Sequence, residues 1–107
     1  MNKYCNINTI IDGIKFASKR EATRYSELKL LENGKAISGL RLQVKYVLTP
    51  AMEGKYRKER ASSYVADFVY LSQGQQVVED CKGMKTPLYV TKRKLMLAIH
   101  GISIFET

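Results

Sequence analysis

Asp67, Asp80 and Lys82 have the residue types and the spacing that metal-assisted hydrolysis requires. Apolar and polar residues alternate in "SSYVADFVYLSQG" (62–74) and "QVVEDCKG" (76–83), which predicts two strands joined as a hairpin. In a regular hairpin Asp67 and Asp80 are cross-strand neighbours, with Cβ atoms roughly 5 Å apart. The strand face that carries Asp67 is then expected to include Val65, Val69 and Leu71.

Two carboxylates that face each other on a sheet destabilise it unless a cation lies between them. A hard divalent ion, Mg²⁺ or Mn²⁺, resolves the conflict because it prefers oxygen ligands. Lys82 lies on the same predicted strand face as Asp80, where it can orient a water or stabilise charge on a phosphate. The alternative is an ion-pair network, with Asp80 paired to Lys82 and Asp67 paired to another basic residue. Spacing alone leaves both interpretations open.

Glu79 precedes Asp80 and points to the opposite strand face, where we expect it to be paired or solvated. A bulge in this strand would make Glu79 the metal ligand instead. Gln43 is a polar residue between Leu42 and Val44, and it either lines the site or belongs to the solvent face of an alternating strand.

Composition and charge indicate one small globular domain with a polyanionic partner. The chain has 107 residues, of which 45% are hydrophobic, and it carries 18 Lys and Arg against 10 Asp and Glu. A pI near 9.6 favours nucleic acid before a membrane, although a merely basic surface remains the alternative. The sequence contains neither an apolar run of membrane-spanning length nor a signal peptide, which predicts a cytoplasmic protein. One histidine and two cysteines argue against a zinc hydrolase and a disulfide framework.

Turn and capping residues predict the order of the elements. Ser18 and Glu21 form an S-x-x-E capping box for a first helix that ends at Asn33-Gly34. Thr86-Pro87 begins a second helix, which ends near His100-Gly101. The expected order is a hairpin at 4–16, a helix at 18–33, a strand at 37–49, a basic loop through residue 60, the hairpin at 62–83 with its turn at Gln73-Gly74, the second helix, and a strand at 102–106. This order predicts an α+β domain over residues 1–107 with a mixed sheet flanked by helices.

The segments "DGIKFASKREATRYSEL", "ADFVY" and "VVEDCKG" resemble the PD-(D/E)XK nuclease superfamily, and in particular a group of short uncharacterised phage-encoded members. That superfamily has an acid on one strand, (D/E)-x-K on the next, and a helix–three strands–helix–strand core. The resemblance implies a restriction-endonuclease-like core over 18–106, although Ala66 stands where the family name has proline. It also implies that Asp67, Asp80 and the backbone carbonyl of Cys81 bind Mg²⁺ or Mn²⁺, while Lys82 assists the attacking water. Many members add a carboxylate from the first helix, for which Glu21 is the candidate besides its capping role.

The resemblance further implies a DNA endonuclease that cuts branched or recombining phage DNA in the cytoplasm of a bacterial host. A homodimer is expected, with the hairpin at 4–16 as a candidate dimer element. The rival is a basic nucleic-acid-binding module on the same fold that has no catalytic activity. Expected nucleic-acid contacts lie at the start and along the second helix and in the basic loop, at Lys85, Thr86, Lys92, Lys94, Arg57, Lys58 and Arg60.

Overall fold

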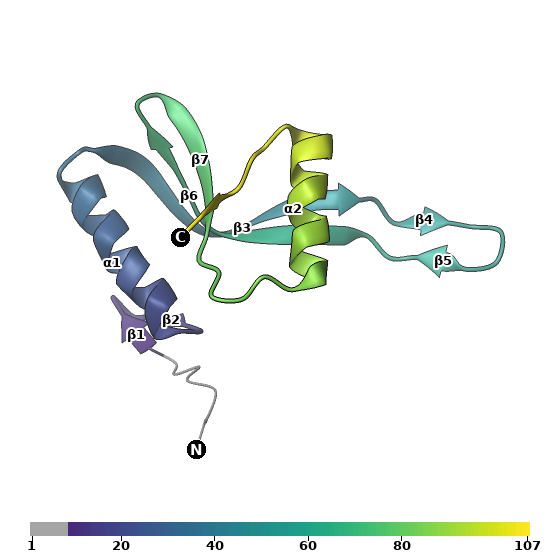
Figure 1. Cartoon of the computed structure of the whole chain (residues 1–107), viewed down its shortest axis with the longest axis horizontal. Helices are drawn as coiled ribbons and strands as arrows, with labels where there is room; N and C mark the ends of the chain where they lie inside the picture. The colour runs from purple at the N-terminus through teal and green to yellow at the C-terminus, as the bar shows by residue number, and fades with distance from the viewer. Residues whose placement is uncertain (1–8) are drawn as a thin grey trace, which may run out of the picture. The chain divides into compact units, whose positions relative to one another are not determined.

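The structure, a computed structural model, describes residues 9–107 and has an α+β architecture (Figure 1). Strands β3, β6, β7 and β8 form a mixed sheet in that order, and β1–β2 and β4–β5 form two separate antiparallel pairs. The elements are β1 (Thr9–Ile11), β2 (Ile14–Phe16), α1 (Lys19–Asn33), β3 (Ile37–Thr49), β4 (Met52–Glu53), β5 (Lys58–Glu59), β6 (Ser62–Ser72), β7 (Gln75–Asp80), α2 (Pro87–His100) and β8 (Phe105–Glu106). The predicted class and order are confirmed, and the likeness to a restriction endonuclease stays a prediction.

The chain divides into two compact units, each made of two segments. The first consists of the described residues up to Leu40 together with Tyr70–Gln76. The second consists of Arg41–Val69 and Val77–Thr107. The first unit begins with the β1–β2 hairpin, whose turn residues Asp12 and Gly13 both have positive φ, 54° and 75°. Two positive φ angles define the type I′ turn that the Asp-Gly pair predicts. Residues 4–8 of the predicted hairpin, which the proposed dimer element includes, lie outside the described residues.

Helix α1 begins and ends through local hydrogen bonds. Ser18 accepts a hydrogen bond from the backbone N–H of Glu21 at 3.2 Å, as the capping box predicts. The last turn closes as a Schellman motif, in which the N–H groups of Lys35 and Ala36 donate to the carbonyl oxygens of Glu32 and Leu31. The helix ends at Asn33 as predicted, and the face that it buries consists of Ala22, Tyr25 and Leu28.

The left-handed residue of this motif is Lys35, with φ 64°, and not the neighbouring Gly34, with φ −82°. A side chain in this conformation costs free energy because its Cβ approaches the following carbonyl. Lys35→Gly is therefore expected to raise the free energy of unfolding by about 1 kcal/mol, measured by urea denaturation. Lys19→Gly removes the same charge from the first turn of α1 and should instead destabilise the protein. An equal decrease in the free energy of unfolding in Lys35→Gly and Lys19→Gly would contradict the assignment of Lys35 as the left-handed residue.

The second unit buries a core between α2 and the sheet. Tyr89 and Met96 of α2 contact a cluster of buried side chains from the strands and the segment before β8, namely Leu48, Tyr64, Ala66, Val69, Val78 and Ile104. Thr86 accepts a hydrogen bond from the N–H of Tyr89 at 3.1 Å, and Gly101 adopts φ 67° after the last turn. Both predicted ends of this helix are confirmed. The chain then returns as β8, which pairs in parallel with β7.

Strand β6 departs from the predicted alternation. Tyr64, Ala66 and Val69 all belong to the same core cluster, although strict alternation would place Val69 on the other face. The prediction that Val69 lies on the opposite face of the strand from Tyr64 and Ala66 is therefore wrong. Alternation places residues two positions apart on the same face, but Ala66 and Val69 are three positions apart. The strand therefore has one extra residue between them, as in a β-bulge, and Asp67 lies in this segment.

The third predicted strand, 76–83, is shorter than expected. β7 ends at Asp80, so Lys82 is not on the strand. The N–H of Lys82 donates to the carbonyl oxygen of Thr107 at 3.2 Å, and the N–H of Thr107 donates to the carbonyl oxygen of Asp80 at 3.0 Å. The backbone beyond Asp80 is therefore held by the residue that follows β8.

The predicted basic loop contains a short β-hairpin. β4 and β5 pair in the register Met52↔Glu59 and Glu53↔Lys58, and in Figure 1 this hairpin projects from the rest of the second unit. We call residues 51–60 the basic arm. Within residues 9–107, neither helix has the length and apolar character needed to cross a bilayer.

Candidate active site

A pocket of about 380 Å³ lies in the second unit, between the start of α2 and strands β6 and β7. Asp80 and Lys82, two of the three residues predicted to act in metal-assisted hydrolysis, line this pocket. Thr86 and Lys92, both predicted to contact nucleic acid, also line it, together with Tyr64 and Tyr89 among others. The structure therefore brings the end of β7 and the beginning of α2 to one concave surface.

Asp80 is a buried carboxyl group, 2% exposed, at the last position of β7. The hydroxyl of Tyr64 donates to its Oδ2 at 2.7 Å, and Lys82 Nζ lies 3.7 Å from the same oxygen. A buried charge is costly unless it is paired and hydrogen-bonded, and both conditions are met here.

Asp67 lies directly beside Asp80. Its Oδ2 accepts a hydrogen bond from the backbone N–H of Cys81 at 2.9 Å, and Gln43 Nε2 lies 3.4 Å from Oδ1. The Asp67 carboxyl group is close enough to that of Asp80 to raise its pKa. The predicted proximity of Asp67 and Asp80 is therefore confirmed, and Gln43, with φ 53° in the middle of β3, contacts the pair from the neighbouring strand.

Burial raises the pKa of Asp80 to about 7, and the neighbouring Asp67 carboxyl group acts in the same direction. The hydrogen bond from Tyr64 and the charge of Lys82 lower this pKa and only partly offset the rise. Asp80 can therefore hold a proton at neutral pH in the metal-free protein, because burial and the neighbouring Asp67 carboxyl group disfavour its charged form.

This pKa shift predicts how the stability of the metal-free protein depends on pH. The folded protein keeps the proton on Asp80 to a higher pH than the unfolded chain, whose ordinary value is 3.8. The stabilisation from this group is complete below that value and is lost as the pH rises to about 7, an effect on the order of a few kcal/mol. Urea denaturation in EDTA across this range should show the loss in the wild type and not in Asp80→Asn. Parallel pH profiles would contradict the prediction.

Lys82 is held between a carboxylate and an aromatic ring. Besides its contact with Asp80, its Nζ lies 4.6 Å from the centroid of the Tyr89 ring. A lysine over an aromatic face gains a cation–π attraction, which restricts an otherwise flexible side chain. The predicted pairing of Lys82 with Asp80 is confirmed, although the residue lies beyond the strand.

Glu106 is a site-adjacent residue that the sequence did not reveal. It is the parallel partner of Asp80 on β8, and it accepts hydrogen bonds from the Tyr89 hydroxyl at 2.6 Å and from Arg93 at 3.0 Å. The hydrogen bond from Tyr89, followed by that from Arg93, lowers the pKa of Glu106. Lys85 Nζ also lies 3.8 Å from this carboxylate, so this predicted DNA contact has an acidic partner within the protein.

The other predicted acidic residues lie elsewhere. Glu79 is fully buried and accepts a hydrogen bond from Thr107 Oγ1 at 3.0 Å, so the expectation that it is paired is confirmed and the alternative that it is solvated is wrong. Glu21 belongs to the first unit, where its N–H completes one half of the capping box. Its predicted role as a metal ligand stays a prediction, as does that of the Cys81 carbonyl.

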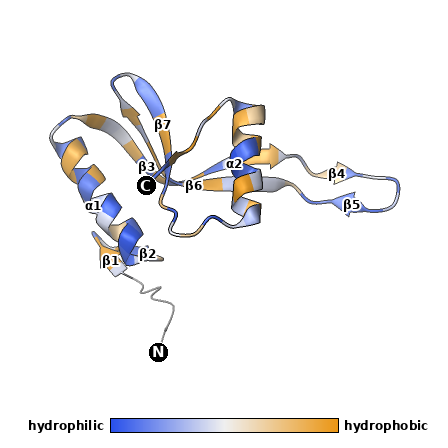
Figure 2. Ribbon diagram, in the orientation of Figure 1, coloured by the Kyte–Doolittle hydropathy of each residue, from blue (hydrophilic) through white to orange (hydrophobic). Residues whose placement is uncertain are grey.

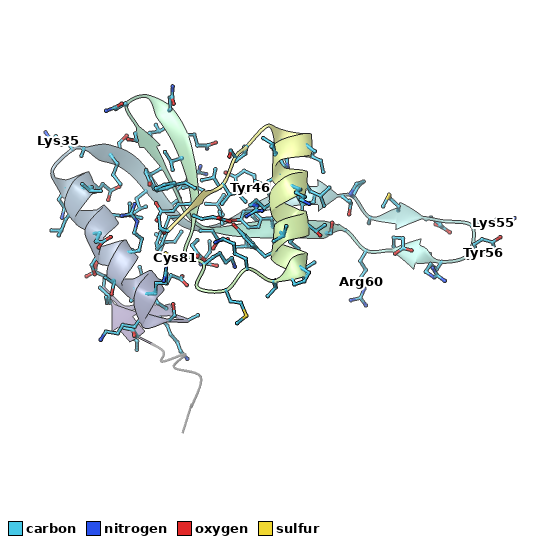
Figure 3. All side chains as sticks on the ribbon, viewed as in Figure 1. Lys35, Tyr46, Lys55, Tyr56, Arg60 and Cys81 are labelled. Atoms are coloured by element: carbon cyan, nitrogen blue, oxygen red, sulfur yellow. The ribbon has the colours of Figure 1, made fainter. Side chains whose placement is uncertain are left out.

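The remaining predicted nucleic-acid contacts occupy two surfaces of the second unit. Lys94 is exposed on α2, close in sequence to Lys92, and Figure 2 shows this part of the helix as a hydrophilic band between apolar turns. Arg57, Lys58 and Arg60 are exposed on the basic arm. Figure 3 shows the side chains of Lys55 and Tyr56 at the tip of the arm and that of Arg60 near its base.

The side chains present fit a magnesium site only in part. Within residues 9–107, no group of three or more His, Cys, Asp and Glu side chains is close enough to hold a metal ion. The oxygens of Asp67 and Asp80 nevertheless match the needs of Mg²⁺, which binds proteins through one or two carboxylates and completes its shell with waters and substrate phosphates. The site could thus bind a cation together with a phosphate.

A comparison with protein families finds one match for the sequence. A family model described as "Protein of unknown function (DUF1064)" matches residues 1–100. No curated protein and no solved structure matches the chain. The match includes Asp67, Asp80, Lys82 and all of α2, and it ends before Glu106.

Proposed function

The chain belongs to the DUF1064 family of proteins of unknown function, and we propose that it is a metal-dependent DNA endonuclease of the PD-(D/E)XK type. One observation carries the proposal. Lys82 Nζ lies 3.7 Å from Asp80 in an open pocket, and Asp67 lies beside Asp80, where it accepts a hydrogen bond from the N–H of the next residue, Cys81. Two adjacent acids and a lysine are the groups that an acid-x-lysine nuclease needs.

The two acids have the role of metal ligands in this proposal. Asp67 and Asp80 would hold Mg²⁺ or Mn²⁺, which supplies Lewis-acid stabilisation of a phosphate and acidifies a bound water. Asp80 is the better placed of the two, because it lines the pocket and its backbone is fixed by β8. Glu79, the alternative ligand, is less suitable since it is fully buried and hydrogen-bonded to Thr107.

Lys82 has the role of the positively charged catalytic group. Its ammonium lines the pocket and is held by Asp80 and the Tyr89 ring, so little reorganisation is needed when negative charge develops on a phosphate oxygen. Lys92 lines the same pocket and has no salt bridge in the described part of the chain, which leaves its charge available for a neighbouring phosphate. Lys85 is less suited to this task because Glu106 pairs with it.

The substrate that we propose is branched or recombining DNA, and a homodimer would cut its two strands. A chain of 107 residues with net charge +8 has little room for base-reading elements, so phosphate contacts and DNA shape should dominate recognition.

One feature of the site favours the rival function, a binding module without catalysis. Both oxygens of Asp67 already have partners, the Cys81 N–H and Gln43, as expected of a structural carboxylate. Asp67→Asn separates the two functions. A nuclease loses about 100-fold or more in cleavage rate and keeps its DNA affinity, because a metal ligand is lost and no phosphate contact is removed.

The measurement is cleavage and binding of the same labelled DNA in Mg²⁺, with Asp12→Asn as the matched control. Asp12 lies in the exposed β1–β2 turn and bonds only to Tyr25 among the interactions that the structure gives it. Unchanged cleavage in Asp67→Asn would remove Asp67 from the proposed metal site, and a wild type that binds without cutting would favour the binding module.

A further inference from the structure

The basic arm is an extended surface with no role in the core. Every residue from 50 to 61 is exposed, and the strands β4 and β5 contact each other through only two registered pairs. At its base, the hydroxyl groups of Thr49 and Ser62 lie 2.7 Å apart, and the Ser62 N–H donates to Thr49 Oγ1 at 3.2 Å. The hairpin is thus anchored to the longer strands β3 and β6 and is exposed along its length.

The charges of the arm match a polyanion. It carries four cations against two carboxylates, Glu53 and Glu59. None of the four cations makes a salt bridge within residues 9–107. They are Lys55, Arg57, Lys58 and Arg60. Cations that are exposed and unpaired are available for phosphates, because no internal carboxylate has to be displaced.

The tip of the arm presents an aromatic ring. The N–H of Gly54 donates to the carbonyl oxygen of Arg57 at 2.9 Å, so Lys55 and Tyr56 are the two central residues of a tight turn (Figure 3). Tyr56 is 83% exposed, and Lys55 Nζ lies 5.4 Å from its ring centroid. An exposed tyrosine at the end of a projecting turn adds nothing to the core, but its ring can stack on a nucleic-acid base.

From these features we propose that the basic arm binds DNA that contains an unpaired base, with the ring of Tyr56 stacked on that base. The faces of bases inside a duplex are covered by their neighbours, so an aromatic ring reaches a face only where the stack is open. The arm's cations then contact the phosphates on either side of this opening. The inference rests on the proposed function only in taking DNA as the partner, and it narrows the substrate to a junction between duplex and single strand.

The length of the arm sets the position of the unpaired base. Tyr56 is six positions before Ser62 at the base, a distance of at most about 20 Å in an extended chain. Ser63, Tyr64 and Val65, which follow directly, line the pocket. One DNA strand advances about 3.4 Å per nucleotide, so the opening lies within roughly six nucleotides of the phosphate in the pocket.

The test compares DNA binding of the full chain and its Tyr56 variants in EDTA, where no cleavage occurs. One probe is a forked DNA with the fluorescent base 2-aminopurine at the first unpaired position, and the other is the fully paired duplex of the same length. Tyr56→Ala should weaken binding to the fork about 5- to 100-fold, change duplex binding less than about twofold, and abolish the quenching of 2-aminopurine by stacking. Tyr56→Trp, which keeps an aromatic face, should retain fork binding and quenching.

The residue can be changed without strain, since neither Lys55 nor Tyr56 has positive φ, and circular dichroism would verify the fold of each variant. Equal affinities of Tyr56→Ala and the wild type for the fork would overturn the inference, as would an equal loss on both DNAs. A wild type that binds the fork through Tyr56 but cuts no DNA would retain the inference and reject the nuclease. Cleavage that needs Asp80, together with binding and cleavage that are insensitive to Tyr56, would support the nuclease and reject the stacking by Tyr56. A wild type that binds neither DNA would overturn both the nuclease and the stacking proposal.

Discussion

Lys82→Ala is expected to lower the rate of DNA cleavage by about 100-fold or more. The ammonium of Lys82 lies 3.7 Å from Asp80 and 4.6 Å from the Tyr89 ring, so its position is fixed before substrate binds. Its removal takes away a preorganised positive charge where negative charge develops on the phosphate. DNA affinity should change less than about threefold, because the variant loses a single cation. Single-turnover cleavage under saturating enzyme separates the chemical step from binding.

The matched control for this variant is Lys85→Ala. Lys85 is also a lysine beside the pocket, but it pairs with Glu106 at 3.8 Å and does not line the pocket. Its substitution should leave the single-turnover rate within about threefold of the wild type. Equal rates for the wild type and Lys82→Ala, or equal losses for the two lysine variants, would show that Lys82 has no specific part in the chemistry.

Asp80→Asn should abolish cleavage to about 1,000-fold or more below the wild type, while DNA binding is retained or becomes tighter. The amide keeps the shape of the side chain and can still contact the Tyr64 hydroxyl, but it carries no charge for a cation. Binding does not weaken, because the substitution removes one negative charge from a pocket lined by Lys82 and Lys92. Cleavage in Mg²⁺ and Mn²⁺ and anisotropy in EDTA measure the two effects.

Glu27→Gln is the control for this charge change. Glu27 is an exposed residue of α1 whose partner is Arg24, at 3.1 Å, so its neutralisation removes the same charge from a surface ion pair of little energetic consequence. The control should cut DNA at the wild-type rate. An Asp80→Asn protein that still cuts would remove this carboxylate from the mechanism and leave it as part of a charge network.

Local physical rules made the helices and turns predictable. Ser18 and Thr86 cap their helices because short polar side chains satisfy the first free N–H groups. The pairs Asp12-Gly13 and Gln73-Gly74 adopt positive φ at both residues, as the type I′ turn favoured in two-residue hairpins requires. β3 has the predicted bounds, Ile37–Thr49, since its alternation continues without a break in the sequence pattern.

The geometry of the site was less predictable because it depends on contacts between distant segments. The phase shift in β6 leaves no signal in sequence, since Phe68, Val69 and Tyr70 are all apolar and fit either face. Glu106 reaches the site because β8 returns beside β7 in parallel, and no local sequence pattern sets the register of two strands that are separated by a helix. The proximity of Asp67 and Asp80 could be predicted because a tight turn connects the strands that lead to them.

The basic arm, too, could be predicted from the sequence only in part. Its charge was evident from "GKYRKER", but the sequence suggested a loop, since Gly54 and the cations interrupt any alternation. In the structure Glu53 and Lys58 are opposite each other in the backbone register of the arm, although their side chains form no salt bridge within residues 9–107, and such long-range register is not visible in the charge pattern.

The most direct test of the central claim is cleavage by the wild-type protein of a labelled DNA panel that contains duplex, single strand, flap and four-way junction. Each DNA would be incubated with Mg²⁺, Mn²⁺ or EDTA, and the products separated by length. The predicted result is cutting in Mg²⁺ or Mn²⁺ that stops in EDTA and is strongest on a branched DNA. Binding to the panel without cutting under any of these conditions would contradict it, and the protein would then be a DNA-binding module in which Asp67 and Asp80 have a structural role.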